Sequence, residues 1–304
     1  MKKNKSIISV DKLTLCYVAT DELVERLSKN NELVDRDDCF RLIRTKSDEA
    51  FFADSFDILI KIPKKNGESG YIERKMATLT SKLRTMVDSK INYVWLYVDN
   101  WAFYEVFGIY DGSKCNWLSC IDYIANELGL LFNNITSFDI ALDTNINFAK
   151  KIKRAQFNDD VEVILNGKVR KDKKEVLNEI GYYQTADQCR MRTLTIYVDQ
   201  KKEDGLELRV YDKHREIEEK SHKVYIPVWN GLKNGSHRIE LSIKNEHLKE
   251  FYIQKGQVIP DELLMTTLAS QQQSESPLFE MLLYFSNRLL RFRFHGKPIS
   301  IFQL

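Results

Sequence analysis

The sequence predicts an α+β fold: an antiparallel β-sheet core with helices packed on one face, plus a C-terminal helical segment. Strand-like segments dominate the middle of the chain, and amphipathic helical patterns lie between them. The short turn DQKKEDG separates two of these segments closely enough for antiparallel pairing. The chain has 304 residues, of which 43% are hydrophobic, so it can bury a substantial core.

The predicted strands are rich in β-branched and aromatic residues, and most alternate between apolar and polar positions. They are FDILIKI (56–62), YVWLYV (93–98), SFDIALD (137–143), TLTIYV (193–198), LELRVYDK (206–213) and SHRIELSIK (236–244). Apolar residues at intervals of three and four predict helices between them. These helices cover about residues 20–30, 76–88, 117–130, 212–222 and 245–255.

The pattern changes after Pro260, where ELLMTTLASQQQ and PLFEMLLYFSNRLLRFRF read as two helices with no strand. We therefore expect residues 1–255 to form the main domain and residues 256–304 to form a C-terminal helical appendage.

Composition limits the classes of protein to consider. No run approaches the ~18 apolar residues of a membrane span, and MKKNKS does not lead into a signal-peptide core. The five cysteines are scattered without a CxxC pair, as expected for reduced thiols. We therefore expect a cytoplasmic protein without a membrane partner. The net charge is only +2, so any contact with nucleic acid must come from local basic segments.

Alternation along the strands separates an aliphatic face of the predicted sheet from a polar one. The polar positions are Asp139, Asp143, Tyr197, Glu207, Arg209, Tyr211, Lys213, Arg238, Glu240 and Ser242. A solvated sheet face often looks like this, which is the alternative to a site. Aspartate is depleted in strands, however, and two aspartates on one face suit a hard divalent cation.

The motifs FDIALD, TIYV followed by LRVYDK, and RIELSIKNEHL, in this order, resemble the replication-initiation-factor (Rep_trans) family over about residues 90–255. The family comprises initiators of rolling-circle plasmids, related relaxases and initiators of some filamentous phages. The resemblance implies a metal-dependent nickase. Its tyrosine cuts one strand at the replication origin and stays joined to the 5′ end, which leaves a 3′-hydroxyl primer.

By motif, the resemblance implies Tyr197 as the nucleophile. It also implies Asp139, Asp143 and Glu240 as ligands of Mg²⁺ or Mn²⁺, and Arg209, Arg238 and Lys213 as cations beside the phosphate. The family strand continues with Gly-Ser where this chain has YVDQKKEDG, so Tyr211 stays the alternative nucleophile. The implied partners are origin DNA with a single-stranded or hairpin nick site, a host helicase and a second copy of the chain.

Charge alone predicts which residues contact duplex DNA. The first candidates are Arg288, Arg291, Arg293 and Lys297, and the second are Lys168, Arg170 and Lys171. A third basic segment, KKIKRAQ, covers residues 150–156. Two other functions compete with the nickase: a non-catalytic DNA-binding protein on the same scaffold, and a metal-dependent nuclease that uses water.

Overall fold

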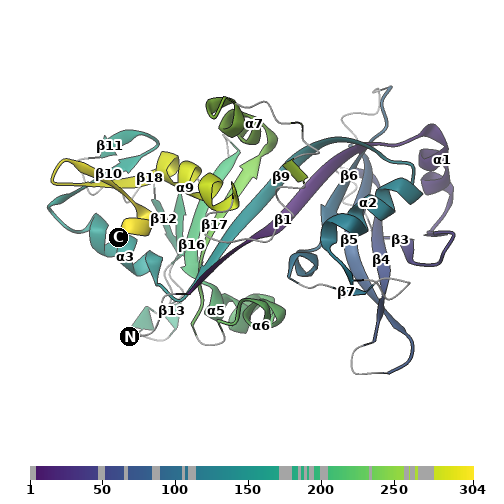
Figure 1. The fold of residues 1–304 in the computed structure, drawn as a ribbon, viewed down its shortest axis with the longest axis horizontal. Coiled ribbons are helices and arrows are strands. Elements are labelled where there is room, and N and C mark those ends of the chain that lie inside the picture. Colours follow the sequence, from purple (N-terminus) through teal and green to yellow (C-terminus); the bar gives the residue numbers. More distant parts are fainter. Residues whose placement is uncertain are drawn as a thin grey trace. The chain divides into compact units, whose positions relative to one another are not determined.

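The structure is a computed structural model, and the chain forms two compact units in it (Figure 1). It describes residues 5–46, 52–64, 68–83, 90–104, 107–108, 114–170, 180–183, 186–187, 190–191, 195–198, 205–232, 235–256, 260, 264–265 and 277–304. The first unit comprises Met1–Asp11, Asp139–Val258 and Ser270–Leu304, and the second comprises Lys12–Phe138 and Ile259–Ala269. Helices and antiparallel strands are mixed in the chain, which confirms the predicted α+β fold.

An antiparallel sheet forms the centre of the first unit. Its strands, in spatial order, are β12 (Ile180–Tyr183), β15 (Thr195–Val198), β16 (Leu206–Asp212), β17 (His237–Lys244), the end of β9 (Leu131–Thr144) and the start of β1 (Ser6–Val18). The pairing of β15 with β16 confirms the hairpin expected around DQKKEDG. A minor hairpin joins β13 (Ala186–Asp187) to β14 (Arg190–Met191).

Helices cover the aliphatic face of this sheet. They include α3 (Phe148–Gln156), α7 (Asn245–Gln254) and α9 (Pro277–Leu289), of which α3 contacts β16 while α7 and α9 contact β17. Leu208 and Leu241 on the strands are buried, and so are Phe251 of α7 and Phe285 of α9, whose ring centroids lie 5.9 Å apart. The remaining helical elements are α5 (Lys213–Glu216), the π-helical turn η3 (Ile217–Ser221) and α6 (Tyr225–Asn230).

The C-terminal residues contain strands that the sequence reading missed. Helix α9 ends at Leu289, and β18 (Leu290–Phe294) and β19 (Lys297–Ser300) follow it, with the turn η4 (Ile301–Gln303) at the end. The buried Leu290 and Phe292 alternate with the more exposed Arg291 and Arg293. Burial thus repeats every two residues, as in a strand and not as in a helix. The expected helix is therefore confirmed over 277–289 and wrong over 290–294.

Strands β18 and β19 complete a second, four-stranded sheet in the first unit. Its order is β11 (Lys168–Arg170), β10 (Val161–Leu165), β18 and β19. Residues 270–304 thus pack in the same unit as residues 139–258. The domain division expected after residue 255 stays a prediction, and the compact units divide the chain at other positions.

The second unit is built on a sheet in the order β9, β1, β6, β5, β4, β3 and β2. Its elements are β1, α1 (Asp21–Lys29), β2 (Glu32–Val34), β3 (Phe40–Arg44), β4 (Phe52–Pro63), β5 (Tyr71–Leu83), β6 (Tyr93–Val98), η2 (Asn100–Phe103), β7 (Phe107–Gly108), β8 (Lys114–Cys115), α2 (Trp117–Glu127) and β9. None of the helices in the described ranges is long and apolar enough to cross a membrane.

One predicted helix of the second unit is wrong. The segment expected to be helical at 76–88 is strand β5 as far as Leu83, paired with β4 on one side and β6 on the other, and residues 84–89 lie outside the described residues. Backbone hydrogen bonds to a strand on each side outweigh the weak local preference of these residues for a helix.

The aliphatic face predicts a large effect of truncating one buried isoleucine. Ile239 of β17 is 0% exposed, whereas Ile253 of α7 is 64% exposed. We expect Ile239→Ala to lower the free energy of unfolding by about 2–5 kcal/mol, because it leaves a cavity. Ile253→Ala, the matched control, should stay within about 0.5 kcal/mol. Urea unfolding measures both, and equal losses would contradict the placement of this face in the core.

Candidate active site

The polar face of the sheet in the first unit is largely buried. Asp139, Glu207 and Glu240 are 6%, 3% and 4% exposed, and Arg238 is 0% exposed. Burying a charged group costs free energy, and this cost is compensated only when the group is paired and hydrogen-bonded. The alternative of a solvated sheet face therefore does not hold for these residues, and their pairing decides what the face can do.

Three residues form a row across neighbouring strands of this face. Tyr197 on β15 lies directly opposite Arg209 on β16, and Arg209 lies directly opposite Glu240 on β17. Directly opposed residues of antiparallel strands point to the same face, with Cβ atoms roughly 4.5–5.5 Å apart. The row therefore places a partly exposed tyrosine beside a guanidinium group.

Arg209 is the centre of a cluster of carboxylates. Its Nη2 lies 2.6 Å from Oε1 of Glu240 and 3.5 Å from Oδ2 of Asp139, and its Nε lies 2.8 Å from Oε1 of Glu207. Ser242 donates a further hydrogen bond to Asp139. Burial acts to lower the pKa of Arg209, but Glu240, Asp139 and Glu207 outweigh it and raise the pKa above its usual value. One cation thus holds three anions together.

Tyr211 is fixed within the same face. Its hydroxyl donates a 2.6 Å hydrogen bond to Oε2 of Glu240. Burial, and then the charge of Glu240, raise the pKa of Tyr211 well above its usual value. A phenolate at this position is therefore strongly disfavoured, and Tyr211 acts as a hydrogen-bond donor that orients Glu240.

Lys213 follows directly on this strand as the first residue of α5. Its Nζ lies 2.7 Å from Oε2 of Glu216 and 5.7 Å from the centroid of the Tyr211 ring. Burial, and then the nearby charge of Arg238, lower the pKa of Lys213. The amine is thus held at the edge of the polar face by a carboxylate of its own helix.

Tyr197 has a different setting from Tyr211. Its neighbour on the outer side is Gly181 of β12, which has no side chain, and its neighbour on the inner side is Arg209. Tyr197 is partly exposed. The structure therefore separates two tyrosines that strand alternation alone treats as equivalent.

Arg238 and Asp143 form a separate pair on the same face. The guanidinium donates from Nε to Oδ1 and from Nη2 to Oδ2 of Asp143, at 2.7 Å each, and from Nη1 to Oδ1 of Asp11 at 2.6 Å. Asn230 of α6 donates to Asp143 at 3.3 Å. Both oxygens of Asp143 are therefore occupied by protein donors. Asp11 was missed by sequence reasoning, although an aspartate within the apolar stretch SIISVDKLTL was an available signal.

As placed, the predicted ligands Asp139, Asp143 and Glu240 do not fit a metal site. Asp143 is bound by Arg238, while Asp139 and Glu240 face the guanidinium of Arg209. Within the part of the chain that the structure describes, no group of three or more His, Cys, Asp or Glu could hold a metal ion. Asp139, Glu240 and Glu207 offer the oxygen donors that a hard cation prefers, but Arg209 occupies the place between them.

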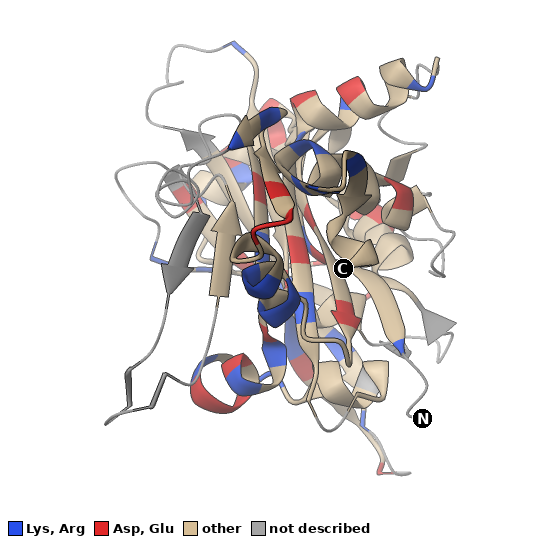
Figure 2. Cartoon of the chain, turned by 90° about the vertical axis from the view of Figure 1, so that its left-hand side faces the viewer, with Lys and Arg blue, Asp and Glu red and all other residues tan. Residues whose placement is uncertain are grey.

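The predicted DNA contacts come together around strand β10. Lys168 and Arg170 lie on β11 and Arg291 and Arg293 on β18, the two strands that flank β10, and α3, which carries the segment KKIKRAQ, also contacts β10. In Figure 2, much of the ribbon of a short helix that faces the viewer is blue, the colour that marks Lys and Arg positions. The three basic segments, far apart in the sequence, thus share one part of the first unit.

The individual DNA candidates differ in how freely they could reach a ligand. Lys168 and Lys297 are exposed. Arg293 lies 2.9 Å from Glu162, and Arg288 donates to both oxygens of Glu250. Lys171 lies outside the residues that the structure describes.

The fold is one that a replication initiator also uses. Among solved structures, the chain is similar to a rolling circle replication initiator protein from Geobacillus stearothermophilus, with a TM-score of 0.51 and 11% sequence identity. The similarity covers 95% of this chain and 87% of that chain. No family model matches the chain, and no curated protein matches it. At this identity the likeness concerns the fold alone, and it confirms the fold that the sequence resemblance implies.

Loss of Arg238 should destabilise the first unit strongly. Arg238→Met leaves Asp143 and Asp11 buried without their cation, which costs about 3–5 kcal/mol of unfolding free energy. Arg293→Met, the matched control, breaks an exposed pair with Glu162 and should cost about 0–1 kcal/mol. Chemical denaturation compares the two variants. A small loss for Arg238→Met would show that the pair does not hold the strands together.

Removal of Arg209 should convert its carboxylates into a cation site. In Arg209→Ala, Glu207, Glu240 and Asp139 lose their shared cation, and we expect Mn²⁺ to bind at least about tenfold more tightly than to the unaltered chain. Titration of Mn²⁺, followed by electron paramagnetic resonance, measures this. Adding Glu207→Gln should reverse most of the gain. Unchanged affinity in a folded Arg209→Ala variant would contradict the idea that Arg209 blocks the ion.

Proposed function

We propose that the chain is a rolling-circle replication initiator that nicks one strand of origin DNA in the cytoplasm. The row formed by Tyr197, Arg209 and Glu240 carries the proposal, because it sets a tyrosine beside a guanidinium on a fold shared with a replication initiator. The motif resemblance to replication initiators, which is independent of this geometry, supports it. Origin DNA is the proposed substrate, and a host helicase and a second copy of the chain are proposed partners.

In the proposed reaction, Oη of Tyr197 attacks the phosphorus of the scissile phosphodiester. The bond between phosphorus and the 3′ oxygen breaks, the 3′ oxygen leaves and takes up a proton, and a 5′-phosphotyrosine remains. The tyrosine loses its own proton, which costs free energy at neutral pH because a free tyrosine has a pKa of about 10. A neighbouring guanidinium such as Arg209 favours the phenolate.

Arg209 also has a role in the transition state of this proposal. Its guanidinium can donate to the phosphoryl oxygens, on which negative charge develops as the bond forms. Glu207, Glu240 and Asp139 hold the guanidinium in place beforehand, and Tyr211 orients Glu240. Tyr211 is therefore a positioning residue in this proposal and not the nucleophile.

Mg²⁺ or Mn²⁺ stays part of the proposal as an implication of the family resemblance. When bound, such an ion would polarise the phosphate and steady the leaving oxygen. Of the three ligands implied by motif, Asp143 is committed to Arg238, and Asp139 and Glu240 could hold an ion only after Arg209 has moved away from them. Nicking assays with Mg²⁺, with Mn²⁺ and with a chelator decide whether the reaction requires the ion.

The two tyrosines form a matched pair for testing the nucleophile. Incubation with origin-like single-stranded DNA and Mn²⁺ should give a covalent protein–DNA adduct on a denaturing gel. Tyr197→Phe should abolish the adduct, because the attacking oxygen is gone. Tyr211→Phe should keep adduct formation within about tenfold, since it removes one hydrogen bond to Glu240.

Other outcomes of the same assay would favour the competing functions. An adduct that persists in Tyr197→Phe and disappears only in Tyr211→Phe would move the nucleophile to Tyr211. Cleaved ends without an adduct would favour a nuclease that uses water. Binding of origin DNA without any cleavage would favour a non-catalytic DNA-binding protein.

A further inference from the structure

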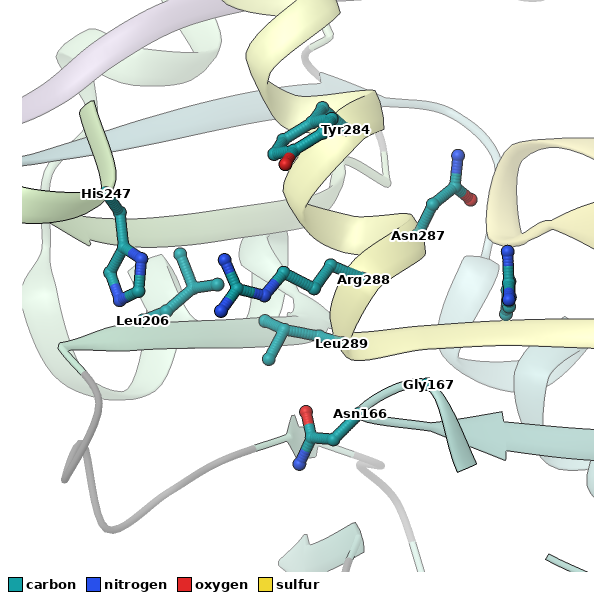
Figure 3. A pocket seen from close by; sticks show the side chains of 9 residues that line it. Asn166, Gly167, Leu206, His247, Tyr284, Asn287, Arg288 and Leu289 are labelled. Atoms are coloured by element: carbon teal, nitrogen blue, oxygen red, sulfur yellow. The ribbon is translucent and has the colours of Figure 1, made fainter. Parts of the chain in front are cut away.

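A cavity of about 700 Å³ lies in the first unit, away from the tyrosine row (Figure 3). It lies among the turn between β10 and β11, the start of β16, helix α7 and the junction of α9 with β18. Its volume is within the roughly 300–1,000 Å³ of sites for small molecules. It is large enough for a nucleotide.

The cavity and the polar cluster lie on opposite faces of β16. Leu206 lines the cavity, whereas the next residue, Glu207, contacts Arg209 on the polar face. Because successive side chains of a strand point to opposite faces, a ligand in the cavity does not meet the Arg209 cluster. The cavity is therefore a site of its own.

The lining of the cavity is cationic. Arg288 and Arg291 give it positive charge, and among the described residues none of the nine that line it is acidic. Glu250 lies beside it and accepts hydrogen bonds of 2.8 and 2.7 Å from Nη1 of Arg288, while Nδ1 of His247 lies 3.2 Å from the same carboxylate. Glu250 thus holds Arg288 and His247 in position, and Figure 3 shows Arg288 extending from α9 toward His247. This arrangement favours an anionic ligand.

Two buried polar atoms of residues that line the cavity have no hydrogen-bond partner in the part of the chain that the structure describes. Nε of Arg291 is a donor without an acceptor, and Oδ1 of Asn287 is an acceptor without a donor. Buried polar groups are nearly always hydrogen-bonded, so a buried group without a partner can indicate a ligand that binds there. A phosphate oxygen accepts from a guanidinium, and the N–H groups of a base donate to an amide oxygen. A nucleotide offers both groups in one molecule.

The turn between β10 and β11 brings open backbone to the cavity. Asn166 and Gly167 have φ angles of 47° and 76°, typical of a two-residue hairpin turn. The N–H of Asn166 donates to the carbonyl oxygen of Leu289 at 3.0 Å, which ties the turn to the end of α9. A Cβ atom at Gly167 would meet no atom within 4 Å. The space beside this backbone is therefore open, and the positive φ of Gly167 is what favours glycine there.

We propose that this cavity binds a nucleotide unit, with its phosphate on Arg288 and Arg291 and its base beside Asn287. The nucleotide is either free or part of a nucleic-acid strand, since both present the same phosphate and base. The proposal rests on the cavity and not on the nicking reaction. The predicted DNA-contact residues fall into two groups in this respect. Arg288 and Arg291 line the cavity, whereas Arg293 and Lys297 do not.

Calorimetric titration of the full chain with dAMP, and with a single-stranded oligonucleotide that lacks origin sequence, tests the proposal. Arg291→Gln should weaken binding about tenfold or more, as expected when one charge-assisted hydrogen bond is lost. Arg26→Gln is the matched control, since Arg26 is an exposed arginine on α1 of the second unit and does not line the cavity. It should change the affinity by less than about threefold.

A second variant tests the same site in case Arg291→Gln does not fold. Asn287→Asp keeps the shape of the side chain and adds a negative charge at the cavity, so it should also weaken binding about tenfold. If Arg291→Gln and Asn287→Asp weaken the binding of both dAMP and the oligonucleotide, the result supports a site for free nucleotides. If they weaken the binding of the oligonucleotide alone, the result supports a site for a nucleic-acid strand. Equal weakening by Arg291→Gln and Arg26→Gln, or no saturable binding of either probe, would overturn the proposal. Adduct formation at Tyr197 is not needed for any of these results.

Discussion

A guanidinium with no exposed surface connects three strands of the first unit. Arg238 on β17 binds Asp143 on β9 through two parallel hydrogen bonds and Asp11 on β1 through a third. Removing these charges from water costs free energy, and only this pairing compensates for it. The register of the strands must therefore satisfy Arg238. Glu240 lies two residues further along β17 and is placed opposite Arg209 by the same register.

The Arg209 cluster shows how one sheet face can give two identical residues different chemistry. Tyr197 and Tyr211 lie on the same polar face, next to the same arginine. Tyr211 is committed to Glu240, and burial raises its pKa, so its phenolate is unfavourable. Tyr197 stands at the outer side of the row, opposite a glycine. The environment, and not the residue type, makes one tyrosine a positioning group and the other a candidate nucleophile.

The first unit carries charged residues on both sides of its sheet, and they are paired differently on the two sides. On one face, carboxylates and guanidinium groups largely satisfy one another. On the other, Arg288 and Arg291 line a cavity, and among the described residues none that lines it is acidic and none is a hydrogen-bond partner of Nε of Arg291. The basic segments of α3, β11 and β18 adjoin β10 beside this cavity. A nearly neutral chain can thus gather basic segments locally, although Glu250 and Glu162 pair with Arg288 and Arg293 there.

The sequence by itself determined the α+β class, the strand at 93–98 and the separation of aliphatic and polar faces, because side-chain alternation is a local property. The helices expected over 76–88 and 277–294 are wrong at 76–83 and 290–294, because pairing with other strands outweighs the local preference there. The partners of Asp143 and Glu240 could not be predicted from the sequence either. Only the tertiary structure sets Arg238 against Asp143 and Arg209 against Glu240, because strand register depends on residues far apart in the chain.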